Sequence, residues 1–122
     1  MTLPVNRSSN EVVLSTRLAD VAAASTVCYV VAPVKGYLNR IYSVVEGTTN
    51  GAPEISVAIN SGSALDQTIT IASGGGAGDV DTASFAPSTS TFVDAGQIIS
   101  LTTDGAGSTT VVTNFFVVID PA

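Results

Sequence analysis

The chain has 122 residues, the length of one domain, and only 11% of them are charged, against about 25% in an average globular protein. Four Lys and Arg residues face ten Asp and Glu residues, and this net charge of -6 excludes the basic surface that binds nucleic acid or an anionic membrane. The absence of His removes the commonest general base and metal ligand, and the single Cys excludes a disulfide framework.

The residue types favour strands along the whole chain. It contains 17 Val, 8 Ile and 15 Thr residues, the β-branched types that fit a pleated, half-buried surface. No apolar run is long enough to span a bilayer, and no long stretch has the helical period. We therefore expect an all-β protein rather than an α/β fold.

Residues 1–10 differ from the rest of the chain. They are polar, contain Pro4 and show no period, so we expect an N-terminal arm followed by a single domain over residues 11–122. Leu3 and Val5 can fill small pockets on a partner, and Arg7 can pair with an acidic group there. The segment lacks the basic-then-apolar order of a signal peptide, so we expect no Sec export.

Eight extended segments follow in chain order, with turn residues about every 8–12 positions. Their expected ranges are 11–18, 26–32, 37–46, 54–60, 67–72, 80–86, 98–103 and 110–119, with a short extended stretch at 91–93. The connector between the first two has room for one helical turn, at 21–24, which is too short to stand alone. This spacing predicts a β-sandwich that is jelly-roll-like, with about eight antiparallel strands.

Some segments are apolar on both faces. Strict alternation divides the segment 37–46 into two faces, with Leu38, Arg40, Tyr42 and Val44 on one and Tyr37, Ile41 and Val45 on the other. We therefore expect a central strand, or one that a partner covers. The same rule puts Tyr37 and Tyr42 on opposite faces and separates Phe115 from Phe116. As the cover of such two-faced strands we favour a second subunit over a loop.

The core is predicted from the inward positions of this alternation. The expected core residues are Val12, Leu14, Val30, Leu38, Ile55, Val57, Ile59, Ile69, Ile71, Leu101, Phe115 and Val117.

Two loop features are candidates for ligand binding. The glycine-rich stretch 73–79 is superficially similar to a phosphate-binding loop, but it lacks the Lys that follows in such loops and ends on Asp79, so we expect a strand connector. Asp79 and Asp81 can offer two carboxylates to Ca²⁺, which needs several further oxygens, from Ser73, Asp104 or the backbone. We expect a solvated loop end, leave calcium binding open and assign no metal site.

Catalytic chemistry has few candidates. Cys28 lies in the most apolar segment with no His to activate it, so we expect a small buried hydrophobe rather than a nucleophile. The acidic residues lie mostly in loops or at strand ends, and without Trp a sugar-stacking subsite is thin. We therefore expect neither enzymatic activity nor a cofactor.

Two segments resemble small proteins encoded in the head gene clusters of tailed bacteriophages. Residues 29–44, YVVAPVKGYLNRIYSV, are similar to their Val-Ala-Pro-Val-x-Gly run and the aliphatic and basic positions after it. Residues 92–105, FVDAGQIISLTTDG, are similar to their Val-x-Ala-Gly-Asp turn and the strand after it, with Gln97 in place of the usual Asp. The stretch 78–81 also recurs in them, and the similarity spans about 26–119.

The resemblance implies a capsid decoration (cement) protein, or a related head-surface protein, of a tailed phage. Such proteins have β-sandwich or jelly-roll cores and commonly form trimers on the shell. The resemblance thus implies a homotrimer, the major capsid protein as partner and a place on the virion surface after synthesis in the host cytoplasm. It transfers no catalytic residue. The alternative is a carbohydrate- or receptor-binding β-sandwich module of a phage fibre or spike, which calls for exposed aromatics beside planar polar side chains.

Overall fold

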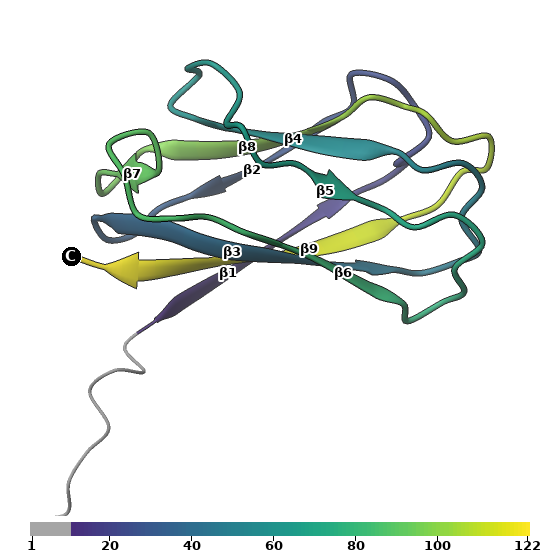
Figure 1. The fold of residues 1–122 in the computed structure, drawn as a ribbon, viewed down its shortest axis with the longest axis horizontal. Helices are drawn as coiled ribbons and strands as arrows, with labels where there is room; N and C mark the ends of the chain where they lie inside the picture. Colours follow the sequence, from purple (N-terminus) through teal and green to yellow (C-terminus); the bar gives the residue numbers. More distant parts are fainter. Residues whose placement is uncertain (1–10) are drawn as a thin grey trace, which may run out of the picture.

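The computed structural model describes residues 11–122, which form two stacked antiparallel sheets (Figure 1). The strands are β1 (Val12–Leu18), β2 (Val27–Val31), β3 (Gly36–Val45), β4 (Glu54–Ile59), β5 (Ile69–Thr70), β6 (Val80–Ser84), β7 (Phe92–Val93), β8 (Ile98–Thr103) and β9 (Thr113–Pro121). Sheet A has the order β1-β9-β3-β6, with β7 also paired to β3, and sheet B has the order β2-β8-β4-β5. This part of the chain contains no helix, and so none that is long enough to cross a membrane.

The order of the strands is that of a jelly roll. Each sheet pairs a strand from the beginning of the chain with one from its end, β1 with β9 in sheet A and β2 with β8 in sheet B. Next to these lie β3 in sheet A and β4 in sheet B, and every pairing is antiparallel. This nesting is the double Greek key of a jelly roll. The expected fold class is confirmed, as is the central position of the third segment, since β3 lies between β9 and β6.

Most strand ends lie within a few residues of their expected positions, but two segments differ more. The expected strand at 67–72 is reduced to β5, two residues long, so sheet B ends in a very short edge strand. The stretch 21–24 forms turns instead of a helical turn. Its first residue, Val21, is fixed by a backbone hydrogen bond to a residue far away in the sequence, since the Val21 N–H donates to the Val111 carbonyl at 3.0 Å.

One core fills the space between the sheets. Nine of the twelve expected core residues are buried: Val30, Leu38, Ile55, Val57, Ile69, Ile71, Leu101, Phe115 and Val117. The other three, Val12, Leu14 and Ile59, are only partly buried and pack against the margin of the core. They lie on the edge strand β1 and at the end of β4, where fewer neighbours cover a side chain.

A β-bulge breaks the alternation of β3. The pairing of β3 with β9 shifts between Leu38 and Arg40, so Asn39 is an extra residue in the strand. One extra residue reverses the side-chain parity after it. Tyr37 and Tyr42 therefore both lie on the outer face, whereas Leu38 is buried in the core. Two expectations are thus wrong: the tyrosines do not lie on opposite faces, and Leu38 does not share a face with Arg40.

Candidate interaction surfaces

The carboxylates that were candidates for calcium bind backbone amides instead. Asp79 Oδ2 accepts a hydrogen bond from the Gly76 N–H at 2.9 Å, and Asp81 Oδ2 accepts one from the Ala72 N–H at 3.2 Å. Asp104 Oδ1 is used in the same way in another loop. Among residues 11–122, no three His, Cys, Asp or Glu side chains gather as a metal site would require. The geometry therefore adds no acidic ligand to the calcium hypothesis.

The glycine-rich loop, residues 73–79, is tied to the sheet by its own amides. The Gly74 N–H donates to the Thr49 carbonyl at 2.9 Å, and the Gly78 N–H donates to the Val45 carbonyl at 2.8 Å. Amides used in this way do not point together toward a phosphate, as they do in a phosphate-binding loop. The expectation of a strand connector is confirmed.

Cys28 lies in the core, with 6% of its surface exposed. Burial raises the pKa of the Cys28 thiol, and a weaker hydrogen bond with Thr16 acts in the opposite direction. A thiol with a raised pKa is a poor nucleophile because the thiolate is the reactive form. The expected burial of Cys28 is confirmed.

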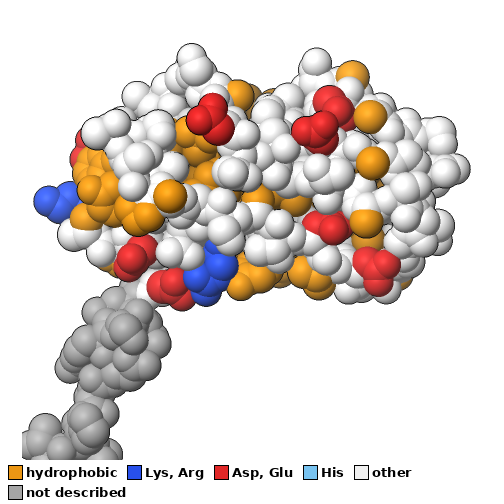
Figure 2. All heavy atoms as spheres, viewed as in Figure 1, with side chains coloured by type: hydrophobic (Ala, Val, Ile, Leu, Met, Phe, Trp, Pro, Cys, Tyr) orange, Lys and Arg blue, Asp and Glu red, His pale blue; other side chains and the backbone are white. Residues whose placement is uncertain are grey.

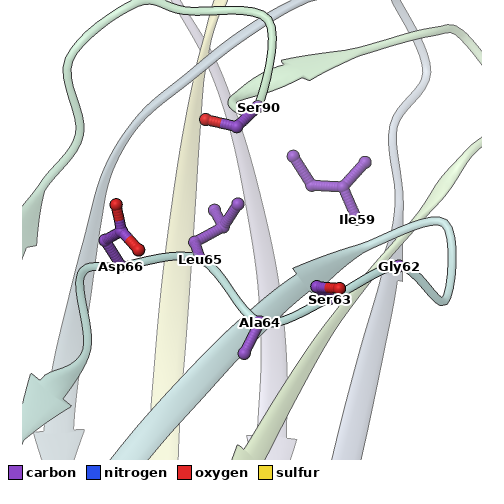
Figure 3. Close-up of a pocket in the computed structure, with 7 residues that line it drawn as sticks. All are labelled: Ile59, Gly62, Ser63, Ala64, Leu65, Asp66 and Ser90. Atoms are coloured by element: carbon purple, nitrogen blue, oxygen red, sulfur yellow. The ribbon is translucent and has the colours of Figure 1, made fainter.

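Two adjoining hollows, of about 310 and 350 Å³, lie where the loop after β4 meets the loop before β7. Figure 3 shows Ile59, Leu65, Asp66 and Ser90 around the first of them. Among residues 11–122, Asp66 is the one acidic or basic residue that lines either hollow. A single carboxylate among hydroxyl and apolar groups supplies no acid–base pair for catalysis.

The outer face of sheet A has apolar side chains on several strands. Val13 is 59% exposed and Phe116 is 36% exposed, while Val118, paired with Val13 in the next strand, is almost fully covered. At one end of the face the rings of Tyr37 and Phe92 meet edge to face, with their centroids 5.4 Å apart. This face combines exposed apolar groups with packed aromatic ones.

A charged cluster lies on the same face of sheet A. The Arg40 guanidinium donates to both carboxylate oxygens of Glu11, each at 3.0 Å, and its Nε donates to the Tyr42 hydroxyl at 2.7 Å. The guanidinium carbon also lies 5.6 Å from the centre of the Tyr42 ring. The hydrogen bonds to Glu11 first, and then to Tyr42, raise the pKa of Arg40. The cluster fixes Glu11 on sheet A, at the point where residues 1–10 join the domain.

The outer face of sheet B has a compact apolar patch. Tyr29 is 58% exposed, Val31 is 57% exposed and Ile98 is 41% exposed. Val31 pairs directly with Ile98 across β2 and β8, and Tyr29 lies two residues along the same strand face, opposite Ser100. We call Tyr29, Val31 and Ile98 the sheet B patch. Large apolar side chains gathered on a surface in this way make the patch a candidate for contact with another molecule.

The two outer faces differ in charge. The outer face of sheet A carries Arg17, Arg40 and Asp120, whereas the strands of sheet B contain only one charged residue, Glu54 at the start of β4. On the side of the molecule seen in Figure 2, charged side chains are scattered among uncharged surface. Because interface centres are depleted of charge, the sheet B patch is the better candidate for a protein contact.

Only some of these surface features could be predicted from the sequence. The expected contact residues, Leu3, Val5 and Arg7, lie outside the described residues. The sheet B patch was not predicted, although the sequence contains a signal for it. Every residue of β2 is apolar, and only alternate residues of a strand can face the core, so the others must lie on the outer face. The pairing of Arg40 with Glu11 had no signal, because the two residues lie 29 positions apart.

Comparison with models of protein families gives no match for this chain, and comparison with curated proteins gives none either. Among solved structures, the chain is similar to one described as "Structure of infectious bursal disease virus Gx strain", with 11% identity and a TM-score of 0.39. The match covers 98% of this chain but 36% of that one, so this chain spans about a third of its length. At this level the similarity carries no argument, and the jelly roll rests on the strand order itself.

Proposed function

We propose that the protein is a structural virion protein, a phage capsid decoration protein that binds the outer capsid surface and stabilises the head. The observation that carries the proposal is the sheet B patch, because an uncharged, exposed apolar face is suited to protein contact rather than to catalysis. The phage assignment comes from the resemblance of residues 29–44 and 92–105 to head proteins. The absence of enzymatic activity and of a cofactor is part of this proposal.

Decoration stabilises a shell by mass action. A protein that binds the assembled state and not the dissociated one shifts the equilibrium toward assembly, and many copies on one shell add their effects. In this proposal residues 1–10 hold the domain to the major capsid protein, with Leu3 and Val5 in small pockets and Arg7 paired with an acidic group. Ten residues can reach up to about 33 Å when extended. The copies also contact one another, and the resemblance implies three per assembly.

Deleting residues 2–9 tests the anchoring role. Titration of the shortened and full-length proteins onto emptied heads of the phage that encodes the chain should show at least about tenfold weaker binding after deletion, about 1.4 kcal/mol. The thermal unfolding midpoint should stay nearly unchanged, since described core residues such as Leu18 and Phe115 lie in the sandwich. A pair of double variants separates the contact residues from the rest of the arm. Replacing Leu3 and Val5 with Ala should weaken binding, whereas replacing Ser8 and Ser9 with Ala is the matched control and should leave binding unchanged. Equal occupancy of the heads by all variants would contradict the role.

The carbohydrate- or receptor-binding alternative predicts a different result. A glycan array should show binding by the fibre or spike module and none by a decoration protein. The exposed ring of Tyr29 has Ser100 opposite it rather than a planar amide or carboxylate, which is a poor sugar site. Glycan binding that the Tyr29→Ala substitution abolishes, together with no binding to heads, would favour the alternative.

A further inference from the structure

We infer that the free edge of β2 pairs with the β2 edge of a second copy of this chain, joining the two B sheets into one. In residues 11–122, β2 is paired with β8 on one side and with no strand on the other. An edge strand presents unpaired N–H and C=O groups that can pair with another chain. The inference concerns the free protein, so it holds or fails independently of capsid binding.

The hydrogen bonds of β2 show which backbone groups face this edge. The Ala32 N–H donates to the Gln97 carbonyl at 2.9 Å, and the Thr103 N–H donates to the Thr26 carbonyl at 3.1 Å. Even-numbered residues therefore bond to β8, because bonding direction alternates along an antiparallel strand. The N–H and C=O groups of the odd-numbered residues then point to the open side. These residues are Val27, Tyr29 and Val31.

The side chains at this edge suit a second copy of an acidic protein. The chain has a net charge of -6, so two copies repel each other except where their surfaces carry little charge. Neither β2 nor its neighbour β8 contains a charged residue, and Tyr29 and Val31 are more than half exposed. Pairing of the β2 edges themselves brings no like charges together, and it extends the sheet B patch across both molecules.

The other edges of the two described sheets are very short or carry charged side chains, which is how edge strands are usually protected. β1 carries Arg17, whose side chain is 63% exposed, and Glu11 precedes it. Charged side chains on an edge oppose pairing with another chain. On the opposite side of the molecule, the edge strand β5 has only two residues, and β6, the second edge of sheet A, carries Asp81. β2 is thus the edge with the fewest obstacles to pairing.

The pattern of free backbone groups also sets the register. A twofold axis at Tyr29 places Tyr29 opposite Tyr29 of the second copy and Val27 opposite Val31, which uses all five residues of β2. Residues opposite each other share a face, so the two tyrosine rings lie side by side on the outer surface. Such pairing joins two copies, whereas the resemblance implies three, and the mass of the oligomer in solution distinguishes them.

Crosslinking tests the register. In the pairing, the two Tyr29 Cα atoms lie about 5.5 Å apart, within the range of about 4.4–6.8 Å for a disulfide. The variant Tyr29→Cys should form a disulfide-linked dimer under mild oxidation. Ser100→Cys, on the same face but one strand further in, should not, since two copies of residue 100 are three strand spacings apart, about 14 Å. Equal crosslinking of both variants, or of neither, would overturn the register.

A matched pair of charge substitutions tests the pairing itself. Val31 and Val13 are 57% and 59% exposed and lie on the two edge strands β2 and β1. In sedimentation equilibrium of the full chain, Val31→Lys should raise the dissociation constant of the dimer at least about tenfold, and Val13→Lys should change it by less than about twofold. Wild-type protein that stays monomeric at 100 µM, or a trimer that both substitutions leave intact, would overturn the inference. A monomer whose β2 amides are protected from hydrogen exchange would also overturn the inference, because residues 1–10 of the same chain would then cover the β2 edge.

Discussion

Sheet A and sheet B bury apolar side chains against each other, but their outer faces are built differently. In sheet A the long strand β3 contains a bulge, and Arg40 and Glu11 form a two-bonded ion pair over the outer surface. In sheet B the strands pair without a bulge, and the outer face has Tyr29 and Val31 exposed with almost no charge. Sheet A also exposes Val13, Val80 and Phe116, so the two sheets differ in charge more than in exposed apolar side chains. In a chain with so few charged residues, the position of the charges therefore decides which face is better suited to meet another molecule.

The largest expected effect is a difference in stability loss between an inward-facing and an outward-facing side chain of sheet A. Phe115 and Phe116 are neighbours on β9, with 0% and 36% of their surfaces exposed. Phe115→Ala should lower the free energy of unfolding by about 3–5 kcal/mol, because it leaves a cavity in the core. Phe116→Ala should cost less than about 1.5 kcal/mol, since the ring is partly in water. Urea denaturation measures both, and similar losses would contradict the assignment of faces.

Deletion of Asn39 tests the bulge that distinguishes the two sheets. Side chains of a regular strand alternate between its two faces. Without the extra residue, Leu38 and the core residues after it can therefore no longer all face the core. We expect a loss of about 2–4 kcal/mol in the free energy of unfolding. Asn39→Ala keeps the residue count and should cost less than about 1 kcal/mol. A deletion variant as stable as Asn39→Ala would show that the bulge is not needed.

Cys28 gives sheet B a dependence on alkaline pH. The pKa of its thiol is raised in the folded state, so the unfolded chain loses the proton first, and stability falls as pH rises past about 8.5, the usual thiol value. Below that pH the contribution is fully present. Denaturation between pH 7 and pH 10 should therefore show a steeper decline for the wild type than for Cys28→Ala. Parallel curves would mean that the thiol does not contribute.

The smallest expected effect comes from the ion pair on sheet A. Arg40→Gln and Glu11→Gln should each lower the thermal unfolding midpoint slightly, and the double variant should add little to either, because the two side chains act together. The difference from the wild type should shrink at 1 M salt, where screening acts over about 3 Å. Additive losses that salt does not change would show that packing on Tyr42 matters more than charge.

The fold was predictable because its strands obey simple alternation. The run Glu54–Ile59 shows this, since Ile55 and Val57 were expected inside and are fully buried. The bulge at Asn39 was not predictable, because its sequence differs in no visible way from a regular strand. The length of β5 was overestimated because apolar alternation continues to Ile71, which is buried without belonging to the strand.

The interaction surfaces were less predictable than the core. The two-faced character of Phe115 and Phe116 was expected and is confirmed. The position of β2 at an edge is set by pairings with distant β8, so the exposure of Tyr29 on an open edge could not be derived from local pattern. The arm residues Leu3, Val5 and Arg7 keep their predicted role as a hypothesis for the capsid experiment.

Amide hydrogen exchange at two protein concentrations tests most directly whether the β2 edge and the β1 edge differ as described. At high concentration the amides of Val27, Tyr29 and Val31 should exchange at least about tenfold more slowly than at low concentration, because a second copy accepts their hydrogen bonds. The amides along β1 should exchange at the same rate in both samples. Slowing along β1 with no change along β2 would contradict the assignment of the open edge.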